Sequence, residues 1–469
     1  MSALAPLLAT ALVALAVAVP GGATAETAFD ALRPTAAALR DKALADTRAY
    51  DFTEALTTEI GARPAGSPAM LAAADWAVAR LKAMGFDKVW TEPFTVTAWI
   101  RGPENASVVA PYPHALSVAA LGRSIATPPE GIEAEIAVFA TYDAMLALPP
   151  GALAGKIAVI NQVMPRTQGP EAYFATTRIR SGASEAARRG AVAYLVRSLS
   201  TGSSRAPHTG AMRYDPALPR IPAAALATPD ADLLARMAAR GAPVRVKLSL
   251  ASTTRENAET RTVVAELTGR EKPGEVVLIG GHLDSWDVGT GAVDDAVGVG
   301  IVTTVGKLIA ELPHRPRRTI RIALFGAEEI GGSGAAYAAR HGAAEQAKHV
   351  IASEADSGAD KVYLVELPAG AAESPFGRAF ADLISPLGAV VSENTATDGG
   401  ADMSRLRGVP LANLQQDLTT YFDLHHSADD TFDKIDRARL AQAVAAWTVF
   451  TYLAADSDVD FRAPPPSRP

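Results

Sequence analysis

Short segments of this 469-residue sequence concentrate histidine and carboxylate side chains, which bind metal ions through nitrogen and oxygen. The first segment contains His282 and Asp284, and the second contains the adjacent pair Asp294 and Asp295. The sequence has no cysteine, so a zinc–thiolate site, a cysteine nucleophile and a disulfide are all excluded. Any metal in this protein must therefore be bound by His, Asp and Glu.

Three further segments have the same character. Glu328 and Glu329 follow one apolar stretch, Asp356 follows another, and His425 and His426 lie in the last segment. Each segment is expected at a strand end or in a loop, where active sites of open α/β sheets collect. One such segment would be weak evidence. All five in order favour two divalent cations that share one bridging carboxylate.

The spacing inside two segments suggests separate roles for neighbouring residues. In an extended strand, His282 and Asp284 point to the same side, so the carboxylate can orient the ring while its other nitrogen faces a metal. Glu328 and Glu329 would face opposite ways, so that one glutamate binds a metal and the other faces the reacting water. The doublet therefore predicts a metal ligand beside a general base.

The elements that must position these residues alternate between strand and helix from Thr262 onward. This alternation predicts an α/β fold with a mixed, mostly parallel sheet and helices on both faces. The expected strands are 88–100, 276–280, 319–325, 349–353 and 362–364, and the expected helices are 69–84, 296–312, 334–341 and 436–455.

Composition divides the chain into several parts. Residues 112–252 have short strands interrupted by many Pro and Gly residues, and we interpret them as an inserted α+β domain. The insert would separate 26–111 from 253–456, the first and second parts of one domain that carries the metal site. Residues 457–469 form a Pro-rich tail that we expect to be frayed. The sequence leaves the role of the insert open: it could be a lid, a substrate gate or a contact in a homodimer.

Residues 1–25 predict export. They contain no charged side chain and end in the small-x-small sequence Ala23-Thr24-Ala25, as a cleavable signal peptide does. An uncleaved anchor is the rival, but the apolar run is short for a span of ~20 residues. We expect a periplasmic or secreted protein with no stable membrane span after cleavage. With 44 basic and 51 acidic residues, no nucleic acid is expected as a partner.

Taken together, the five segments resemble the co-catalytic dizinc exopeptidases of metallopeptidase family twenty-eight, clan MH. The resemblance covers nearly the whole chain after the leader, and it implies a phosphorylase/hydrolase-like zinc-exopeptidase fold with a protease-associated insert. It also implies two Zn²⁺ ions, which Co²⁺ or Mn²⁺ could replace, and a cis peptide between Asp294 and Asp295. The implied roles are first-metal binding by His282 and Asp356, bridging by Asp294, second-metal binding by Glu329 and His426, general base for Glu328, and orientation of His282 by Asp284.

The resemblance implies hydrolysis of short peptides, in particular unblocked dipeptides, by a metal-bridging hydroxide, an activity of carboxypeptidase or dipeptidase type. An aminopeptidase of the same family is the nearest alternative. A metal-free, receptor-like binding protein and an amide-cyclising enzyme are alternatives from other classes. Asp402 could contact substrate or stabilise a turn, and the glycines around Ser333 only partly match a nucleophile elbow.

Overall fold

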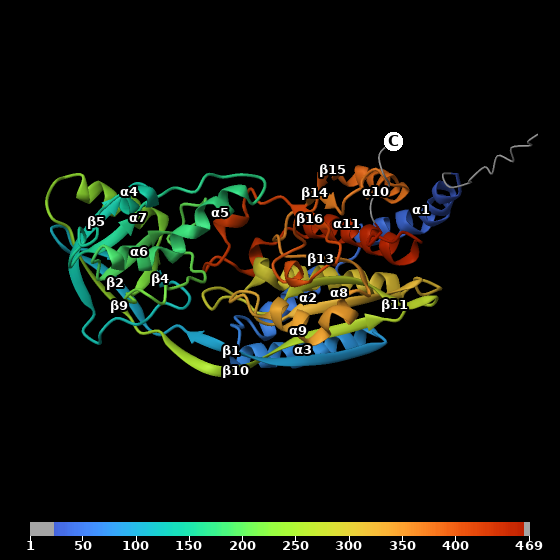
Figure 1. Ribbon diagram of the computed structural model, residues 1–469, viewed down its shortest axis with the longest axis horizontal. Helices are drawn as coiled ribbons and strands as arrows, with labels where there is room; N and C mark the ends of the chain where they lie inside the picture. Colours follow the sequence, from blue (N-terminus) through green and yellow to red (C-terminus); the bar gives the residue numbers. More distant parts are fainter. Residues whose placement is uncertain (1–22, 464–469) are drawn as a thin grey trace, which may run out of the picture.

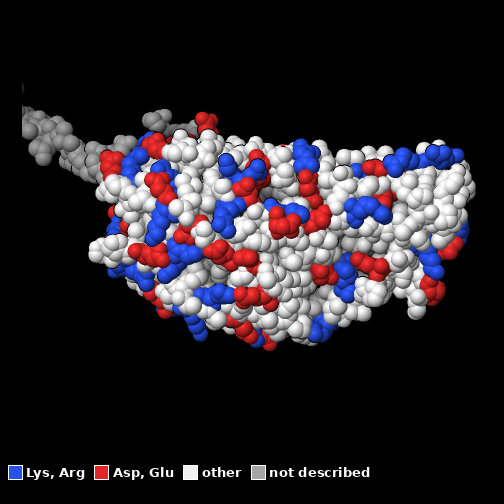
Figure 2. All heavy atoms as spheres, turned by 180° about the vertical axis from the view of Figure 1, so that it is seen from behind, with Lys and Arg blue, Asp and Glu red and all other residues white. Residues whose placement is uncertain are grey.

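The computed structural model describes residues 23–463. Most of the predicted leader, residues 1–22, and residues 464–469 lie outside the described part. Within residues 23–463, no helix combines the length and apolar character needed to cross a membrane. Figure 1 shows an elongated molecule with two lobes side by side. On the face drawn in Figure 2, basic and acidic side chains are interspersed.

The larger lobe is built on a five-stranded sheet with the order β1-β10-β12-β11-β13. Strand β11 is parallel to its neighbours β12 and β13, whereas β10 is antiparallel to both β12 and β1. The predicted α/β fold with a mixed sheet is confirmed. The strands are β1 (Lys88–Ile100), β10 (Thr253–Leu267), β11 (Lys272–His282), β12 (Arg318–Phe325) and β13 (His349–Glu354).

Helices cover both faces of this sheet, because alternate residues of each strand face opposite sides. In β10, Val263 and Ala265 join the core beneath most of the helices, while Val264 joins a smaller core that contains Tyr337 of α9. The first face is covered by α1 (Ala23–Leu44), α2 (Arg48–Glu59), α3 (Pro68–Met84), α8 (Val297–Ala310) and α11 (Arg437–Asp456), and the second by α9 (Ser333–Gln346).

Local sequence explains where one of these helices begins and ends. The side chain of Ser67 accepts a hydrogen bond from the backbone N–H of Met70, and Pro68 occupies the first turn of α3. Gly85 ends the helix in the left-handed conformation, with φ +84°.

The helices and strands predicted for the larger lobe are present, and their ends are shifted by a few residues.

A second, three-stranded sheet lies beside the main sheet and has the order β15-β14-β16. The sequence predicted only the first part of β14 (Val362–Leu367). It missed α10 (Pro375–Ile384), β15 (Val390–Thr395) and β16 (Asn413–Gln416). The outer strands are short and largely polar, so their apolar pattern is weak.

The inserted lobe contains an eight-stranded mixed sheet with the order β3-β2-β9-β5-β6-β7-β8-β4. Its strands are β2 (Glu104–Ala110), β3 (His114–Leu116), β4 (Val118–Ala120), β5 (Ile132–Phe139), β6 (Ile157–Ile160), β7 (Ala193–Arg197), β8 (Ala223–Leu226) and β9 (Arg245–Leu250). Its helices are α4 (Tyr142–Leu146), α5 (Glu171–Thr176), the 3₁₀ helix η1 (Thr177–Gly182), α6 (Ala183–Arg188) and α7 (Thr228–Ala238).

The start of this lobe differs from the predicted boundary at residue 112. Strand β2 pairs with β9 and β3, so residues 104–110 belong to the inserted lobe. The Pro-rich segment 111–113 is the connection between β2 and β3 instead of a boundary between domains.

Two long strands join the lobes, and loops then bring the lobes into contact. β1 and β10 pair from Lys88 opposite Glu266 to Ile100 opposite Thr253, and they form the arm at the bottom of Figure 1. At the site, the backbone N–H of Thr209 donates to the carbonyl of His426 at 2.9 Å. The inserted lobe is therefore attached both at its base and at the loop that carries His425 and His426.

The segment that follows α11 is ordered, so the predicted frayed tail is wrong for residues 457–463. The ring of Phe461 lies 4.9 Å from that of Phe376 and edge-on to it. The guanidinium of Arg462 lies 3.1 Å from the carboxylate of Glu275. An apolar ring and an ion pair hold this segment on the body of the protein.

Candidate metal centre

The predicted site residues follow the carboxyl ends of neighbouring parallel strands. His282 is the last residue of β11 and lies opposite Phe325, the last residue of β12, so Glu328 and Glu329 follow at the same edge of the sheet. Asp356 comes two residues after β13 ends at Glu354. Parallel strands bring their carboxyl ends to one edge, so segments far apart in sequence meet there.

Asp294 lies between two groups of donor atoms. Its Oδ1 is 3.0 Å from Nε2 of His282, and the same nitrogen is 3.5 Å from Oδ1 of Asp356. Its Oδ2 is 3.1 Å from Nε2 of His426, which is 3.0 Å from Oε2 of Glu329. The five residues predicted as ligands therefore come together as two groups, and one carboxylate oxygen of Asp294 faces each group.

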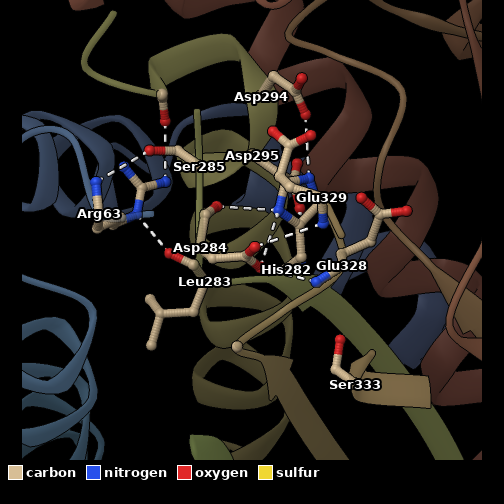
Figure 3. A network of polar contacts seen from close by, with 12 residues as sticks. Arg63, His282, Leu283, Asp284, Ser285, Asp294, Asp295, Glu328, Glu329 and Ser333 are labelled. Carbon is tan, nitrogen blue, oxygen red and sulfur yellow. Dashed lines mark hydrogen bonds and ion pairs between the residues drawn. The ribbon is translucent and has the colours of Figure 1, made fainter. Parts of the chain in front are cut away.

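The peptide between Asp294 and Asp295 is cis, as the resemblance implied. The neighbouring carboxylate of Asp295 has a different use, since it accepts the backbone N–H of His282 at 2.9 Å and that of Gly298 at 3.1 Å. Asp295 thus connects the end of β11 to the first turn of α8. Figure 3 shows Asp294 and Asp295 close to His282.

The donor atoms fit divalent cations. Oε1 of Glu329 is buried and has no hydrogen-bond partner in the described part of the chain, and the buried Oδ2 of Asp294 has only the imidazoles of His425 and His426 near it. The His and carboxylate side chains form three overlapping sets, and within each set the donor atoms lie within 4.8 Å of one another. Buried carboxylates that repel one another need compensating positive charge, and a set of nitrogen and oxygen donors suits borderline or hard divalent metals.

The two adjacent histidines, His425 and His426, are not equivalent. His426 approaches Asp294 and Glu329, whereas Nε2 of His425 lies 3.6 Å from Oδ2 of Asp294. The two rings stack, with centroids 3.5 Å apart. The geometry favours His426 as the ligand and His425 as a residue that packs against it.

Burial and neighbouring charge shift the pKa values of the site residues. Burial raises the pKa of Glu329 to about 7 and raises that of Glu328 well above its ordinary range. Burial lowers the pKa of His426, but the nearby carboxylates of Glu329 and Asp294 together more than offset this, and the pKa rises to about 9. Because the carboxyl of Glu328 lies at the cavity and its pKa is raised, it is suited to accept and return a proton.

Asp284 differs in detail from the prediction. β11 ends at His282, so Asp284 is not in the strand, and Nδ1 of His282 donates to the backbone carbonyl of Asp284 at 2.9 Å. The Asp284 carboxylate is 3.7 Å from that nitrogen and instead accepts the backbone N–H groups of Glu328 at 2.9 Å and Glu329 at 3.4 Å. Asp284 therefore touches both His282 and the glutamate doublet.

Arg63 supports the loop that follows His282, and the sequence did not identify it as a site residue. Its side chain is fully buried and donates to the carbonyls of Leu283, Thr290 and Gly291, the last two at 2.8 and 2.9 Å. Figure 3 shows the guanidinium beside the segment that follows His282. The only signal in the sequence is the Gly- and Pro-containing break around residue 63, because a side chain's distant partners leave no local pattern.

Asp402 and Ser333 form a structural pair. Asp402 accepts the hydroxyl of Ser333 at 2.8 Å and the backbone N–H of Gly334 at 2.5 Å, at the beginning of α9. Of the two roles considered for Asp402, the structure supports turn stabilisation. The Ser333 hydroxyl is buried and directed to Asp402, which does not support a nucleophile.

A cavity of about 460 Å³ opens over the metal centre. Glu328, Glu329 and Asp356 line it from the larger lobe, and Tyr173 and Arg180 line it from the inserted lobe. The sequence did not identify any inserted-lobe residue as part of the site, since no local motif marks them. The inserted lobe therefore forms part of the wall of this cavity.

Comparison with known proteins identifies the family. Residues 262–451 match the profile of Peptidase family M28. Carboxypeptidase Q of Bos taurus is 36% identical over 421 residues, which cover 88% of this chain and 86% of the relative. The chain therefore belongs to peptidase family M28, and it is a metallopeptidase.

Individual relatives confirm the resemblance that the motifs suggested. Carboxypeptidase Q of Homo sapiens is 36% identical over 423 residues, with 88% of this chain and 86% of the relative covered. The crystal structure of a peptidase M28 precursor from Shewanella amazonensis SB2B has a TM-score of 0.90 and 44% identity over 94% of this chain and 100% of its own. A zinc aminopeptidase from Bacillus subtilis has a TM-score of 0.65 and 18% identity over 88% and 98%, which shows a shared fold only.

Proposed function

We propose that this protein is a dizinc exopeptidase that hydrolyses short peptides, with unblocked dipeptides as its preferred substrates. The observation that carries the proposal is the position of Asp294, whose two oxygens face His282 and His426 separately. This is the arrangement expected for a carboxylate that bridges two cations. The Bacillus subtilis enzyme of the same fold is described as a zinc aminopeptidase, which supports zinc as the metal.

His282 and Asp356 would hold one cation, Glu329 and His426 would hold the other, and Asp294 would touch both. Cations bound there lower the pKa of water and polarise a carbonyl. In the neutral ring of His282, the hydrogen bond from Nδ1 to a carbonyl leaves Nε2 without a proton, as metal binding requires. This tautomer of His282 therefore suits the role of a ligand.

Glu328 would act as the general base. Its side chain lines the cavity next to Glu329, and its backbone is fixed by Asp284. A carboxylate in this position can accept a proton from the attacking water and pass it to the leaving amine. The raised pKa of Glu328 favours the second of these transfers, since a weakly acidic carboxyl holds the proton until the amine leaves.

The size of the cavity supports short substrates. At about 460 Å³ it accommodates a ligand of roughly dipeptide size, and the inserted lobe closes one side of it. The curated relatives that share most of the chain are called carboxypeptidases, which supports action on peptides with a free carboxyl end.

The test is a panel of unblocked, N-blocked and C-blocked dipeptides, assayed before and after removal of metal by a chelator. The proposal expects activity on the unblocked dipeptide, loss of that activity in the chelated protein, and recovery when Zn²⁺ is added back. Activity that survives complete metal removal would rule out the dizinc mechanism. Absence of any peptide hydrolysis by the metal-loaded protein would favour the receptor-like alternative, and full activity on N-blocked substrates would exclude an aminopeptidase.

We further propose that the protein is exported to the periplasm or secreted. The support is the uncharged leader of residues 1–25 and the description of the Shewanella relative as a precursor. The expected amino terminus of the mature protein is Glu26. Sequencing that terminus after expression of the full chain tests the proposal, and a mature protein that begins at Met1 would contradict it.

A further inference from the structure

Arg180 is a buried arginine that lines the substrate cavity from the inserted lobe. It belongs to η1, and only 6% of its surface is exposed. One nitrogen, Nη1, donates to the hydroxyl of Tyr173 at 2.7 Å. Nε and Nη2 are buried without a hydrogen-bond partner among residues 23–463. Two donors of a buried cation are thus left free beside the site.

Other buried arginines of the protein have compensating partners. Arg63 donates to several carbonyls, Arg318 pairs with Glu275, and Arg321 pairs with Glu266. Arg180 forms no ion pair with any carboxylate in the described part of the chain. Burial of an unpaired cation is costly, so a position of this kind is expected to have an anionic partner that the protein itself does not supply.

The surroundings hold the guanidinium in place and leave room in front of it. The group lies 5.1 Å from the ring centre of Tyr173. On another side it packs against the backbone of Gly210, where an added Cβ would lie 2.5 Å from the guanidinium carbon. A glycine with φ +142° therefore allows the close approach, and a side chain there would displace the guanidinium.

A chain of ring contacts connects Arg180 to the metal centre. The Tyr173 ring lies edge-on to His425, with centroids 5.1 Å apart, and His425 stacks on His426. Tyr173 also stacks on Phe422 at 4.7 Å. Arg180 is therefore held at a fixed position in the cavity that contains the ligands, as a group that recognises one end of a short substrate must be.

We propose that Arg180 binds a carboxylate of the substrate's C-terminal residue through Nε and Nη2, which form a planar fork suited to a carboxylate. The proposal rests on the peptidase function proposed above and makes it more specific. An enzyme that reads this carboxylate accepts a dipeptide or removes a C-terminal residue, whereas an aminopeptidase needs no such contact. The α-carboxylate and an acidic side chain offer the same chemistry, and the experiment separates them.

The experiment compares an unblocked dipeptide with its C-terminal amide, using the zinc-loaded wild-type protein and the Arg180→Met and Arg180→Lys variants. The wild type is expected to prefer the acid by about 100-fold in kcat/KM, because the amide lacks the charged acceptor. In Arg180→Met the two substrates should become equal, mainly through a higher KM for the acid. Arg180→Lys should recover part of the preference, since it keeps the charge and loses the fork.

The matched control is Arg178→Met. Arg178 lies in the same 3₁₀ helix, but it is exposed and pairs with Asp143 on the surface. This variant should keep the wild-type preference. If Arg180→Met does not fold, Tyr173→Phe serves instead, because it removes only the hydrogen bond to Nη1 and should raise KM for the acid but not for the amide.

Two further amides identify which carboxylate is bound. A dipeptide amide that ends in glutamate has a side-chain carboxylate and no α-carboxylate, and the glutamine amide has neither. An Arg180-dependent preference for the glutamate amide assigns the side chain, and equal rates assign the α-carboxylate. Equal wild-type rates on every acid and amide, or an equal loss on both in Arg180→Met, would overturn the proposal. No hydrolysis of any substrate would instead contradict the peptidase function itself.

Discussion

The carboxylate of Asp284 accepts the backbone N–H of Glu328 at 2.9 Å, across 44 residues of sequence. The carbonyl of Asp284 also accepts Nδ1–H of His282 at 2.9 Å. One residue therefore fixes both the orientation of a proposed metal ligand and the backbone of the proposed general base. Residues that orient ligands in this way are expected to affect activity strongly without touching the substrate.

The Asp284→Asn variant should lower kcat or metal affinity about 10- to 100-fold. The amide has one acceptor oxygen and no charge, so it cannot accept both backbone N–H groups of the glutamate doublet as the carboxylate does. Steady-state kinetics and zinc titration measure the two effects. Asp75→Asn is the control, because Asp75 is exposed and pairs with Arg261 on the surface. Equal effects of both substitutions would contradict this role for Asp284.

The Glu328→Gln variant should lose at least about 100-fold in kcat while its metal content stays at the wild-type level. Glutamine keeps the size of the side chain and cannot carry the proton. Glu329→Gln is the paired variant and should lose metal, since Oε2 of Glu329 lies 3.0 Å from Nε2 of His426. Elemental analysis of both proteins gives the answer. Metal loss in Glu328→Gln alone would reverse the two assignments.

The His426→Ala variant should lower the zinc content from about two ions per chain to about one, because one of the two donor groups loses its imidazole. His425→Ala should keep the metal, since its Nε2 is farther from Asp294, at 3.6 Å. Both proteins are dialysed against metal-free buffer before elemental analysis. If His425→Ala loses the metal and His426→Ala keeps it, the choice between the histidines is wrong.

The metal-free protein should lose stability as the pH falls from 6.5 toward 4, in part because of His349. Burial lowers the pKa of this fully buried histidine from 6.5 to about 4. The unfolded chain takes up the proton first as the pH falls below 6.5, so acid favours unfolding, and the loss of stability levels off once the pH is below the folded pKa of about 4.

Between pH 7 and pH 5, this single group should lower the free energy of unfolding by about 2 kcal/mol. Urea unfolding at the two pH values measures it, and His349→Gln is the comparison, because glutamine can hydrogen-bond there and does not titrate. The difference between the two pH values should be smaller in the variant by roughly this amount. An unchanged difference would mean that His349 is protonated in the folded protein.

The sequence predicted strands β1, β11, β12 and β13 of the main sheet and the order of the donor residues. His282, Asp294, Glu329, Asp356 and His426 come at strand ends or in loops. These features can be predicted from short stretches of sequence. A strand is recognised by its apolar pattern, and the polar residues at its end follow directly in the chain. Parallel strands then bring their carboxyl ends together, so the site followed from the alternation of strands and helices.

Only the tertiary structure decided which partners the other polar groups have. Arg63 contacts carbonyls more than 200 residues away, Asp284 serves the glutamate doublet, and Arg180 reaches the cavity from the inserted lobe. Strand β2 joined that lobe through pairing with β9, which lies far along the chain. The physical reason is common to these cases. A buried hydrogen-bond donor or an unpaired strand edge needs a hydrogen-bond partner. Tertiary packing brings that partner from anywhere in the chain, so the spacing of residues in the sequence does not reveal it.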